Sequence, residues 1–375
     1  MMQNILECTL ADLDFKQLKI KDRVLLVTGR KSYIDSGAAS VLSEKLQGKD
    51  VIQFFDFKSN PQLEDVVKGM NLMDRDKPFT IIAVGGGSPM DVAKLIKALS
   101  CQKHDPADYI RGSRKLVSNE HINLIAIPTT SGSGSESTHF AVVYMEKMKY
   151  SLAYQDLLPE SVVLDYTLTK TMSPYQTACT GFDALAQAVE SYWSVNGSDE
   201  SRGYSREAIG LITKHLLSAV NAPDNADRLA MQKAANLAGR AINLTKTTAA
   251  HAFCYYLTSH YGVPHGHAVG LLLGKFFVFN SRISVESRSD ASTTVKAVQE
   301  RILELCHLLG ASSALEADTF LNKLLRECGL ESDIGKIMDI DQEFDDFFSS
   351  VNVQRLGNNP RKVEDQDELL NLLKA

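Results

Sequence analysis

No run of about twenty apolar residues occurs in the 375-residue chain, which excludes a membrane-spanning helix. The first residues carry no basic segment before an apolar run, so no secretory signal is expected. The six cysteines are scattered without a CxxC pair, which favours buried, reduced thiols. An excess of positive charge is also lacking, and the net charge of −6 argues against a general nucleic-acid binder. We therefore expect a cytoplasmic protein without a membrane or nucleic-acid partner.

The patterns that are present change near residue 172. Strands are predicted at residues 24–27, 51–55, 80–84 and 123–127, with helical patterns between them. This alternation indicates a parallel sheet with helices on both faces. Farther along, the periodicity predicts helices at 176–192, 200–220, 227–243, 249–260 and 295–309. We predict an α/β dinucleotide-binding domain over residues 1–172, an all-helical domain over 173–375, and an active site in the cleft between them.

A glycine-rich segment follows the third predicted strand and opens a helix. Glycine lets the backbone approach a pyrophosphate closely, and the helix N-terminus offers free N–H groups. The common pattern GxGxxG is absent, so a purely structural turn is the alternative. We predict that the phosphates of a dinucleotide bind to Gly85, Gly86, Gly87 and Ser88.

A second loop, rich in hydroxyl groups and glycine, follows the fourth predicted strand at 128–136. Hydroxyl groups suit hydrogen bonds to a ribose or to the nicotinamide amide, although a plain polar loop is the alternative. Ligands of open α/β sheets bind at the carboxyl ends of strands, which both loops occupy. We expect Thr129, Thr130 and Ser133 to contact the nicotinamide half of the cofactor.

Four residues of the helical half are candidate metal ligands. His251 and His265 lie on consecutive predicted helices, and Asp183 and Gln187 are four residues apart on one helix face. Oxygen and imidazole ligands of this kind hold divalent ions against a substrate oxygen. Glutamine is a poor substitute for imidazole, so iron, zinc or no metal at all stays open. The alternative is a set of solvated or structural polar residues.

Motifs along nearly the whole chain resemble the iron-containing (group III) alcohol dehydrogenase family, whose fold is related to dehydroquinate synthase. They are Gly85–Ser88 with Asp91 and Lys94, residues 128–136, residues 158–165, residues 180–185 and residues 264–266. The resemblance implies a nicotinamide cofactor, with Asp91 in its motif, and a metal held by one Asp and three His. The matching positions are Asp183, Gln187, His251 and His265, so Gln187 departs from the family pattern. A further family histidine is Tyr255 here.

Within that family, the segments 183–202 and 246–267 resemble the phosphonoacetaldehyde reductases. The resemblance implies reversible hydride transfer to a small aldehyde, with phosphonoacetaldehyde as the preferred substrate and a homodimer as the family expectation. The alternatives are an alcohol dehydrogenase for neutral alcohols, a lyase similar to dehydroquinate synthase, and a catalytically inactive NADP-binding protein.

Three further expectations concern charge. Family members that prefer NAD often carry Asp at the position of Gly29, and Arg30 and Lys31 could attract a 2′-phosphate, so we expect NADP(H) to be favoured over NAD(H). Lys246 and Arg202 are candidates to bind the substrate's anionic group, with solvated surface cations as the alternative. His267 is a candidate for proton delivery or, equally, a structural residue.

Overall fold

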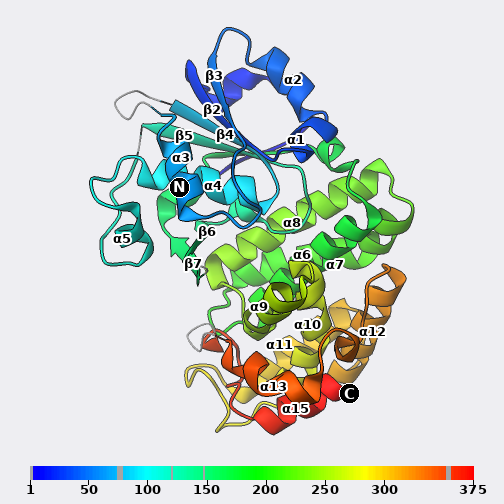
Figure 1. Cartoon of the computed structure of the whole chain (residues 1–375). Coiled ribbons are helices and arrows are strands. Elements are labelled where there is room, and N and C mark those ends of the chain that lie inside the picture. The colour runs from blue at the N-terminus through cyan, green and yellow to red at the C-terminus, as the bar shows by residue number, and fades with distance from the viewer. Residues whose placement is uncertain (1–2, 74–78, 120, 147, 352–355) are drawn as a thin grey trace. The chain divides into compact units, whose positions relative to one another are not determined.

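The computed structural model describes residues 3–73, 79–119, 121–146, 148–351 and 356–375. The chain divides into two compact units, Met1–Thr171 and Met172–Ala375 (Figure 1). The first unit combines a parallel sheet with helices, and the described part of the second unit contains helices without a named strand. The predicted fold class is therefore confirmed.

The first unit is built on a six-stranded parallel sheet with the strand order β1-β8-β5-β4-β2-β3. Its strands are β1 (Asn4–Glu7), β2 (Arg23–Thr28), β3 (Asp50–Phe54), β4 (Phe79–Gly85), β5 (Ile122–Pro128) and β8 (Ser161–Leu164). Strands β2 to β5 are the four that the sequence predicts. Strands β1 and β8, with four residues each, were not predicted, because so short a run carries little pattern.

Short helices and one antiparallel hairpin complete this unit. The helices are α1 (Ser32–Asp35), α2 (Ala38–Lys45), α3 (Leu63–Met70), α4 (Gly87–Leu99) and α5 (Pro106–Ile110). The 3-10 turns are η1 (Phe15–Leu18), η2 (Ser135–Ser137), η3 (Gln155–Leu157) and η4 (Tyr166–Thr169). The hairpin pairs β6 (Phe140–Met145) with β7 (Met148–Ala153).

Alternate residues of β2 point to opposite faces of the sheet, and each face has its own core. Leu25 and Val27 pack in the cluster that contains residues of α3 and α4. Val24 and Leu26 pack in the cluster that contains residues of α1 and α2. Helices therefore cover both faces, which explains why the central strands are continuous apolar runs rather than alternating ones.

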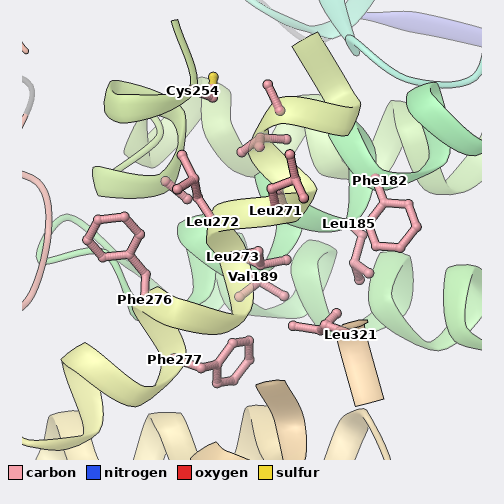
Figure 2. Close-up of a cluster of buried hydrophobic side chains, with 14 of the residues drawn as sticks. Phe182, Leu185, Val189, Cys254, Leu271, Leu272, Leu273, Phe276, Phe277 and Leu321 are labelled. Atoms are coloured by element: carbon pink, nitrogen blue, oxygen red, sulfur yellow. The ribbon is translucent and has the colours of Figure 1, made fainter. Parts of the chain in front are cut away.

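The second unit is helical. Its helices are α6 (Pro174–Trp193), α7 (Asp199–Asn221), α8 (Asn225–Thr245), α9 (Ala249–Tyr261), α10 (His265–Ser281), α11 (Val295–Leu308), α12 (Ala314–Glu327), α13 (Ile340–Ser349) and α15 (Gln366–Lys374), with the 3-10 turn η5 (Ile334–Lys336). Five of them, α6 to α9 and α11, are those whose ranges the sequence predicts. Figure 2 shows part of the core, a single buried cluster that includes Phe276 and Phe277 of α10 and Leu185 and Val189 of α6.

Helix ends in this unit follow the sequence signals. Ser198 and Asp224 close capping boxes at the starts of α7 and α8. Gly262, in the left-handed conformation at φ 68°, ends α9, and Pro264 precedes α10. Two His-bearing helices are thereby separated by a sharp turn. Among the described residues, no helix combines the length and the apolar character that crossing a membrane requires.

Candidate metal and cofactor sites

The glycine segment turns the chain from β4 into α4. Gly85 has φ +146°, and a Cβ there would lie 2.7 Å from Cγ of Pro89, so only glycine fits. Gly86 is the N-cap of α4, and as glycine it has no side chain that could cap the helix. The first N–H groups of α4 are thus left for an anionic ligand, as the phosphate prediction requires. The hydroxyl of Ser88 donates to the carbonyl of Ser59.

The hydroxyl-rich loop lies directly against the glycine segment. Strands β4 and β5 are parallel neighbours, and the Thr129 N–H donates to the Gly85 carbonyl at 3.0 Å. A Cβ on Gly86 would lie 3.2 Å from Oγ1 of Thr130, and one on Gly87 would lie 3.3 Å from Oγ of Ser133. The two predicted cofactor loops therefore form one surface.

The side-chain hydroxyl of Thr129, on this surface, is placed to form a hydrogen bond with a bound ligand. The Thr129 hydroxyl is buried and has no hydrogen-bond partner within the described part of the chain. Buried polar groups are normally hydrogen-bonded. A bound cofactor would supply the partner, so the residues present fit a dinucleotide.

Asp91 and Lys94 belong to the motif that the resemblance assigns to the cofactor. Their side chains form hydrogen bonds with the end of the hydroxyl-rich loop and with the residues that follow it. The Asp91 carboxylate accepts from Ser135 Oγ at 2.7 Å and from the Val142 N–H at 3.1 Å. The fully buried Lys94 ammonium donates to Ser135 Oγ, Thr138 Oγ1 and the Phe140 carbonyl at 2.8–3.0 Å. The Asp91 carboxylate thus supports the hydroxyl-rich loop and the start of β6, and its contact with the cofactor stays a prediction.

Gly29 follows the end of β2 and donates its N–H to the Val84 carbonyl at 3.2 Å, beside the glycine segment. Arg30 is exposed and its guanidinium donates to the Asp56 carboxylate at 2.8 Å. Lys31 lies 3.9 Å from Asp35. Each of the two cations therefore has an acidic neighbour, and their contact with a 2′-phosphate stays a prediction.

Three helices of the second unit bring the metal candidates together. Asp183 of α6, His251 of α9 and His265 at the first position of α10 have ligand atoms that all lie within 4.8 Å of one another. Nε2 of His251 lies 3.3 Å from Asp183 Oδ1, and Nε2 of His265 lies 3.9 Å from the same oxygen. Asp183 and His251 are buried, whereas the side chain of His265 is 36% exposed. One carboxylate and two imidazoles in this arrangement fit zinc or iron.

Gly266 makes this meeting of helices possible. A Cβ at Gly266 would lie 1.8 Å from the Cys179 carbonyl oxygen and 3.0 Å from the Asp183 Cβ. The start of α10 therefore touches the backbone of α6, and His265 reaches Asp183. Its ring also stacks on Tyr255, with the centroids 5.3 Å apart.

Gln187 lies beside Asp183 as predicted, four residues along α6. It is buried, and its Nε2 donates to Asp183 Oδ1 at 3.2 Å. In this orientation the amide supports the carboxylate. A half-turn of the amide would present its oxygen in place of the nitrogen.

The charges of the cluster stabilise one another. Burial alone would raise the pKa of Asp183, but the hydrogen bond from His251 and the charges of both histidines hold that pKa below its ordinary value. Burial alone would lower the pKa of His251, but the Glu190 charge and the contacts with Asp183 and Glu190 raise it to about 10. A metal would displace the proton that these carboxylates hold on His251.

Glu190 is the residue of this site that the sequence reasoning missed. It is fully buried on α6 and its carboxylate contacts Nδ1 of His251. The available signal was its spacing, seven residues after Asp183, which places both on one helix face.

The three candidate catalytic residues, His267, Arg202 and Lys246, lie outside the cluster of Asp183, His251 and His265. The buried His267 ring has Nε2 2.8 Å from the Glu331 carbonyl oxygen, and burial lowers its pKa. Proton delivery by His267 stays a prediction. The Arg202 guanidinium donates to the Gly197 carbonyl and to Asp199 beyond the end of α6. Lys246 is exposed at the C-cap of α8, three residues before α9 begins at Ala249. No contact described here joins Arg202 or His267 to Asp183.

Both units match models of one family. Residues 9–166 match the iron-containing alcohol dehydrogenase model, and residues 177–375 match the C-terminal model of the Fe-containing alcohol dehydrogenase family. The chain therefore belongs to the iron-containing alcohol dehydrogenase family.

The chain is similar to three proteins that act on aldehydes or alcohols by name. The chain is 32% identical over 302 residues to phosphonoacetaldehyde reductase of Streptomyces viridochromogenes, which covers 78% of this chain and 74% of that protein. It is 30% identical over 311 residues to aldehyde-alcohol dehydrogenase 2 of Entamoeba histolytica, covering 78% of this chain but only 35% of that protein's length. The crystal structure of sulfoacetaldehyde reductase from Bifidobacterium kashiwanohense with NAD+ superposes with a TM-score of 0.85 at 27% identity, covering 99% of this chain and 96% of that one.

Proposed function

We propose that the protein reduces a small aldehyde carrying an anionic group, with a nicotinamide cofactor as the hydride donor. The observation that carries this is that a similar sequence and a similar structure are named for reduction of phosphonoacetaldehyde and of sulfoacetaldehyde. Both substrates are two-carbon aldehydes with a strong acid at the other carbon. Phosphonoacetaldehyde, reduced to 2-hydroxyethylphosphonate, is the preferred candidate.

Residues of the first unit would bind the cofactor, and residues of the second unit would bind the metal. The Gly85–Ser88 segment and the Thr129–Ser133 loop would bind the phosphates and the nicotinamide half of the cofactor. Asp183, His251 and His265 would hold a divalent ion, which when bound polarises a carbonyl oxygen. Three protein ligands leave a fourth coordination position open, as catalytic zinc sites do. Gln187 orients Asp183 and stands where a fourth protein ligand would.

Lys246 is the cation that we assign to the substrate's anionic group. Its backbone has φ 63° and ψ 175°, a region that residues other than glycine rarely occupy. The neighbours enforce this conformation: Thr245 Oγ1 donates to Ser191 at 2.8 Å, and Asn358 Nδ2 donates to the Thr247 carbonyl at 3.2 Å. Strain of this kind is kept where the surroundings over-determine it, often at ligand sites. Arg202, whose guanidinium is held by Gly197 and Asp199, is the weaker candidate.

The preference for NADP(H) is part of the proposal. A carboxylate at Gly29 would repel a 2′-phosphate, and its absence leaves Arg30 and Lys31 as the nearest cations along the chain. Asp56 opposes this attraction because its carboxylate already binds the Arg30 guanidinium.

The test is oxidation of NADPH and NADH by the purified protein with phosphonoacetaldehyde, sulfoacetaldehyde and propanal. We expect the highest kcat/KM for the phosphonate, with NADPH. Faster reduction of propanal would favour a neutral-alcohol dehydrogenase instead. Binding of NADPH without turnover of any aldehyde would favour the inactive binding protein, and conversion without net NADPH consumption would favour a lyase.

A further inference from the structure

Glu190 is a fully buried carboxylate that the proposed chemistry does not use. Its Oε1 accepts from the Thr248 hydroxyl at 2.8 Å and from the His251 N–H at 3.2 Å, and its Oε2 contacts Nδ1 of His251. All three contacts come from one short segment, residues 248–251, which carries a candidate metal ligand. A carboxylate placed only to neutralise a buried charge would need no such convergence on a single turn.

Behind Glu190 lies a support that fixes the direction of its hydrogen bonds. The indole N–H of Trp193 donates to Thr248 Oγ1 at 2.9 Å, so the Thr248 hydroxyl must use its own proton toward Glu190. Trp193 is itself fully buried and packs edge-on against Phe277, with ring centroids 5.0 Å apart. The carboxylate therefore has little freedom to turn.

The start of α9 gives independent support. Thr248 is the N-cap residue of α9, yet its hydroxyl makes no capping bond to its own helix. Glu190 replaces that bond from α6 by accepting the His251 N–H, which belongs to the first turn of α9. One carboxylate thus fixes both the backbone and the ring of His251.

We propose that Glu190 is a positioning residue of the metal centre, which holds His251 with Nδ1–H toward Glu190 and Nε2 toward Asp183. The inference rests on the metal part of the proposed function. A metal-binding histidine usually donates its second ring N–H to a carboxylate, which sets the tautomer and the ring orientation. Nε2 of His251 already lies 3.3 Å from Asp183 Oδ1, on the side away from Glu190.

The test compares Glu190→Gln, which keeps the side-chain shape, with the wild type in Zn²⁺ affinity, measured by competition with a chromogenic chelator. We expect Zn²⁺ to bind about 10–100-fold more weakly to Glu190→Gln, the range found for changes behind metal ligands. The visible spectrum of bound Co²⁺ should change as well. The matched control is Asp318→Asn, another carboxylate of the helical unit, which pairs with Lys275 at 3.2 Å. Asp318→Asn should lower thermal stability while leaving Zn²⁺ affinity unchanged.

Aldehyde reduction and metal binding by the wild type separate the two proposals. If the wild type reduces the aldehyde and binds Zn²⁺, and Glu190→Gln binds Zn²⁺ equally well, Glu190 is merely structural and the inference is overturned while the proposed function stands. If the wild type is active but binds neither Zn²⁺ nor Co²⁺, both the role of Glu190 and the metal part of the proposed function are wrong. The assignment as an aldehyde reductase then still stands.

Thr248 provides a second variant should Glu190→Gln fail to fold. Thr248→Val removes the hydroxyl at similar volume, and we expect several-fold weaker Zn²⁺ binding. Thr248→Ser, which keeps the hydroxyl, should bind Zn²⁺ as the wild type does. Wild-type affinity in Thr248→Val would overturn the inference.

Discussion

Gly85, Gly86 and Gly87 offer a ligand almost nothing but backbone, whereas Asp183, His251 and His265 offer only side chains. The first set is contiguous and lies at the end of one strand, where the N-terminus of α4 would supply the N–H groups that bind a ligand. The second set comes from three helices and spans more than eighty residues of sequence. A backbone site depends on local chain geometry, so it can be recognised from a short motif. A side-chain site depends on how distant helices pack.

Removal of the metal should affect the side-chain site and leave the backbone site unchanged, and this is the largest effect that we expect. After exhaustive chelation we expect kcat/KM for the aldehyde to fall by about 1,000-fold, roughly 4 kcal/mol, because carbonyl polarisation is lost. NADPH binding, measured by fluorescence, should be unchanged, since it depends on the N-terminal loops. Added Zn²⁺ or Fe²⁺ should restore activity, and Gln187→His should tighten metal binding by restoring an imidazole. Full activity after chelation would show that no catalytic ion exists.

Loss of Lys94 tests whether the backbone site depends on buried side chains after all. Lys94→Met removes three hydrogen bonds and leaves the Asp91 carboxylate without its cation, so we expect a loss of about 3–5 kcal/mol in the free energy of unfolding. The Kd for NADPH should also rise, because the Ser135 hydroxyl would lose the hydrogen bond from Lys94 and keep only the one to Asp91. Lys296→Met, at an exposed position of α11, is the control and should change neither. Wild-type stability in Lys94→Met would show that the network is dispensable.

The same residue predicts a pH dependence. Burial lowers the pKa of Lys94 from 10.5 to about 8, so the folded protein releases this proton before the unfolded chain does. The cost of burying the charge is fully present below pH 8 and is relieved as the pH rises toward 10.5. The stability of the wild type relative to Lys94→Met should therefore increase between pH 8 and pH 10. A constant difference over that range would contradict the lowered pKa.

Gly266 tests whether the side-chain site in turn rests on backbone contact. Gly266→Ala would place a Cβ 1.8 Å from the Cys179 carbonyl oxygen, and neither backbone can yield easily. We expect about 3 kcal/mol of destabilisation and weaker metal binding, because α10 must move His265 away from Asp183. Gly203→Ala is the matched control on α7, since the added Cβ would meet no described atom within 4 Å other than those of its own helix turn. That control should gain about 0.5–1 kcal/mol from helix propensity.

The sequence predicted features that depend on a short stretch of chain better than features that depend on the packing of distant segments. The glycine segment, the hydroxyl loop and strands β2 to β5 were predicted, because each signal lies within a short stretch of chain. Strand β1 escaped prediction because its four residues are only partly buried. Its place at the sheet edge is set by pairing with β8, more than 150 residues away.

In the helical unit, Asp183, His251 and His265 were proposed together from their spacing on predicted helices and from the family pattern. Glu190 was missed because it looks like an ordinary helix residue until α9 packs beside it. Asp91 was assigned to the cofactor because its motif adjoins the phosphate loop, and the hydrogen bonds of its carboxylate with Ser135 and Val142 were not predicted. These outcomes depend on tertiary contacts that no local pattern specifies.

A change in the preference between NADPH and NADH is expected to be smaller than the effects of Lys94→Met and Gly266→Ala. Gly29→Asp should shift the ratio of kcat/KM values toward NADH by about 10–100-fold, or about 1.4–2.8 kcal/mol, because a carboxylate would face the 2′-phosphate. The added Cβ would also meet Ser32 Oγ at 2.3 Å, so a steric effect must be separated from the charge. Gly29→Ala carries the same Cβ without charge and should leave the ratio unchanged. Equal or better efficiency of the wild type with NADH would contradict the proposed preference.

Lys246 provides the smallest and most specific change. Lys246→Ala should raise KM for phosphonoacetaldehyde about tenfold and leave propanal nearly unaffected, because one charge-assisted contact is lost. Lys246→Gly should raise KM in the same way yet stabilise the fold by about 1 kcal/mol, since glycine tolerates φ 63° and ψ 175°. Lys19→Gly is the matched control: Lys19 has φ 51° and ψ 43°, the ordinary left-handed region, so its gain should be smaller. An equal rise in KM for both aldehydes would contradict the assignment of the anionic group to Lys246. A gain in stability without any change in KM would show that the strain at Lys246 serves no substrate contact.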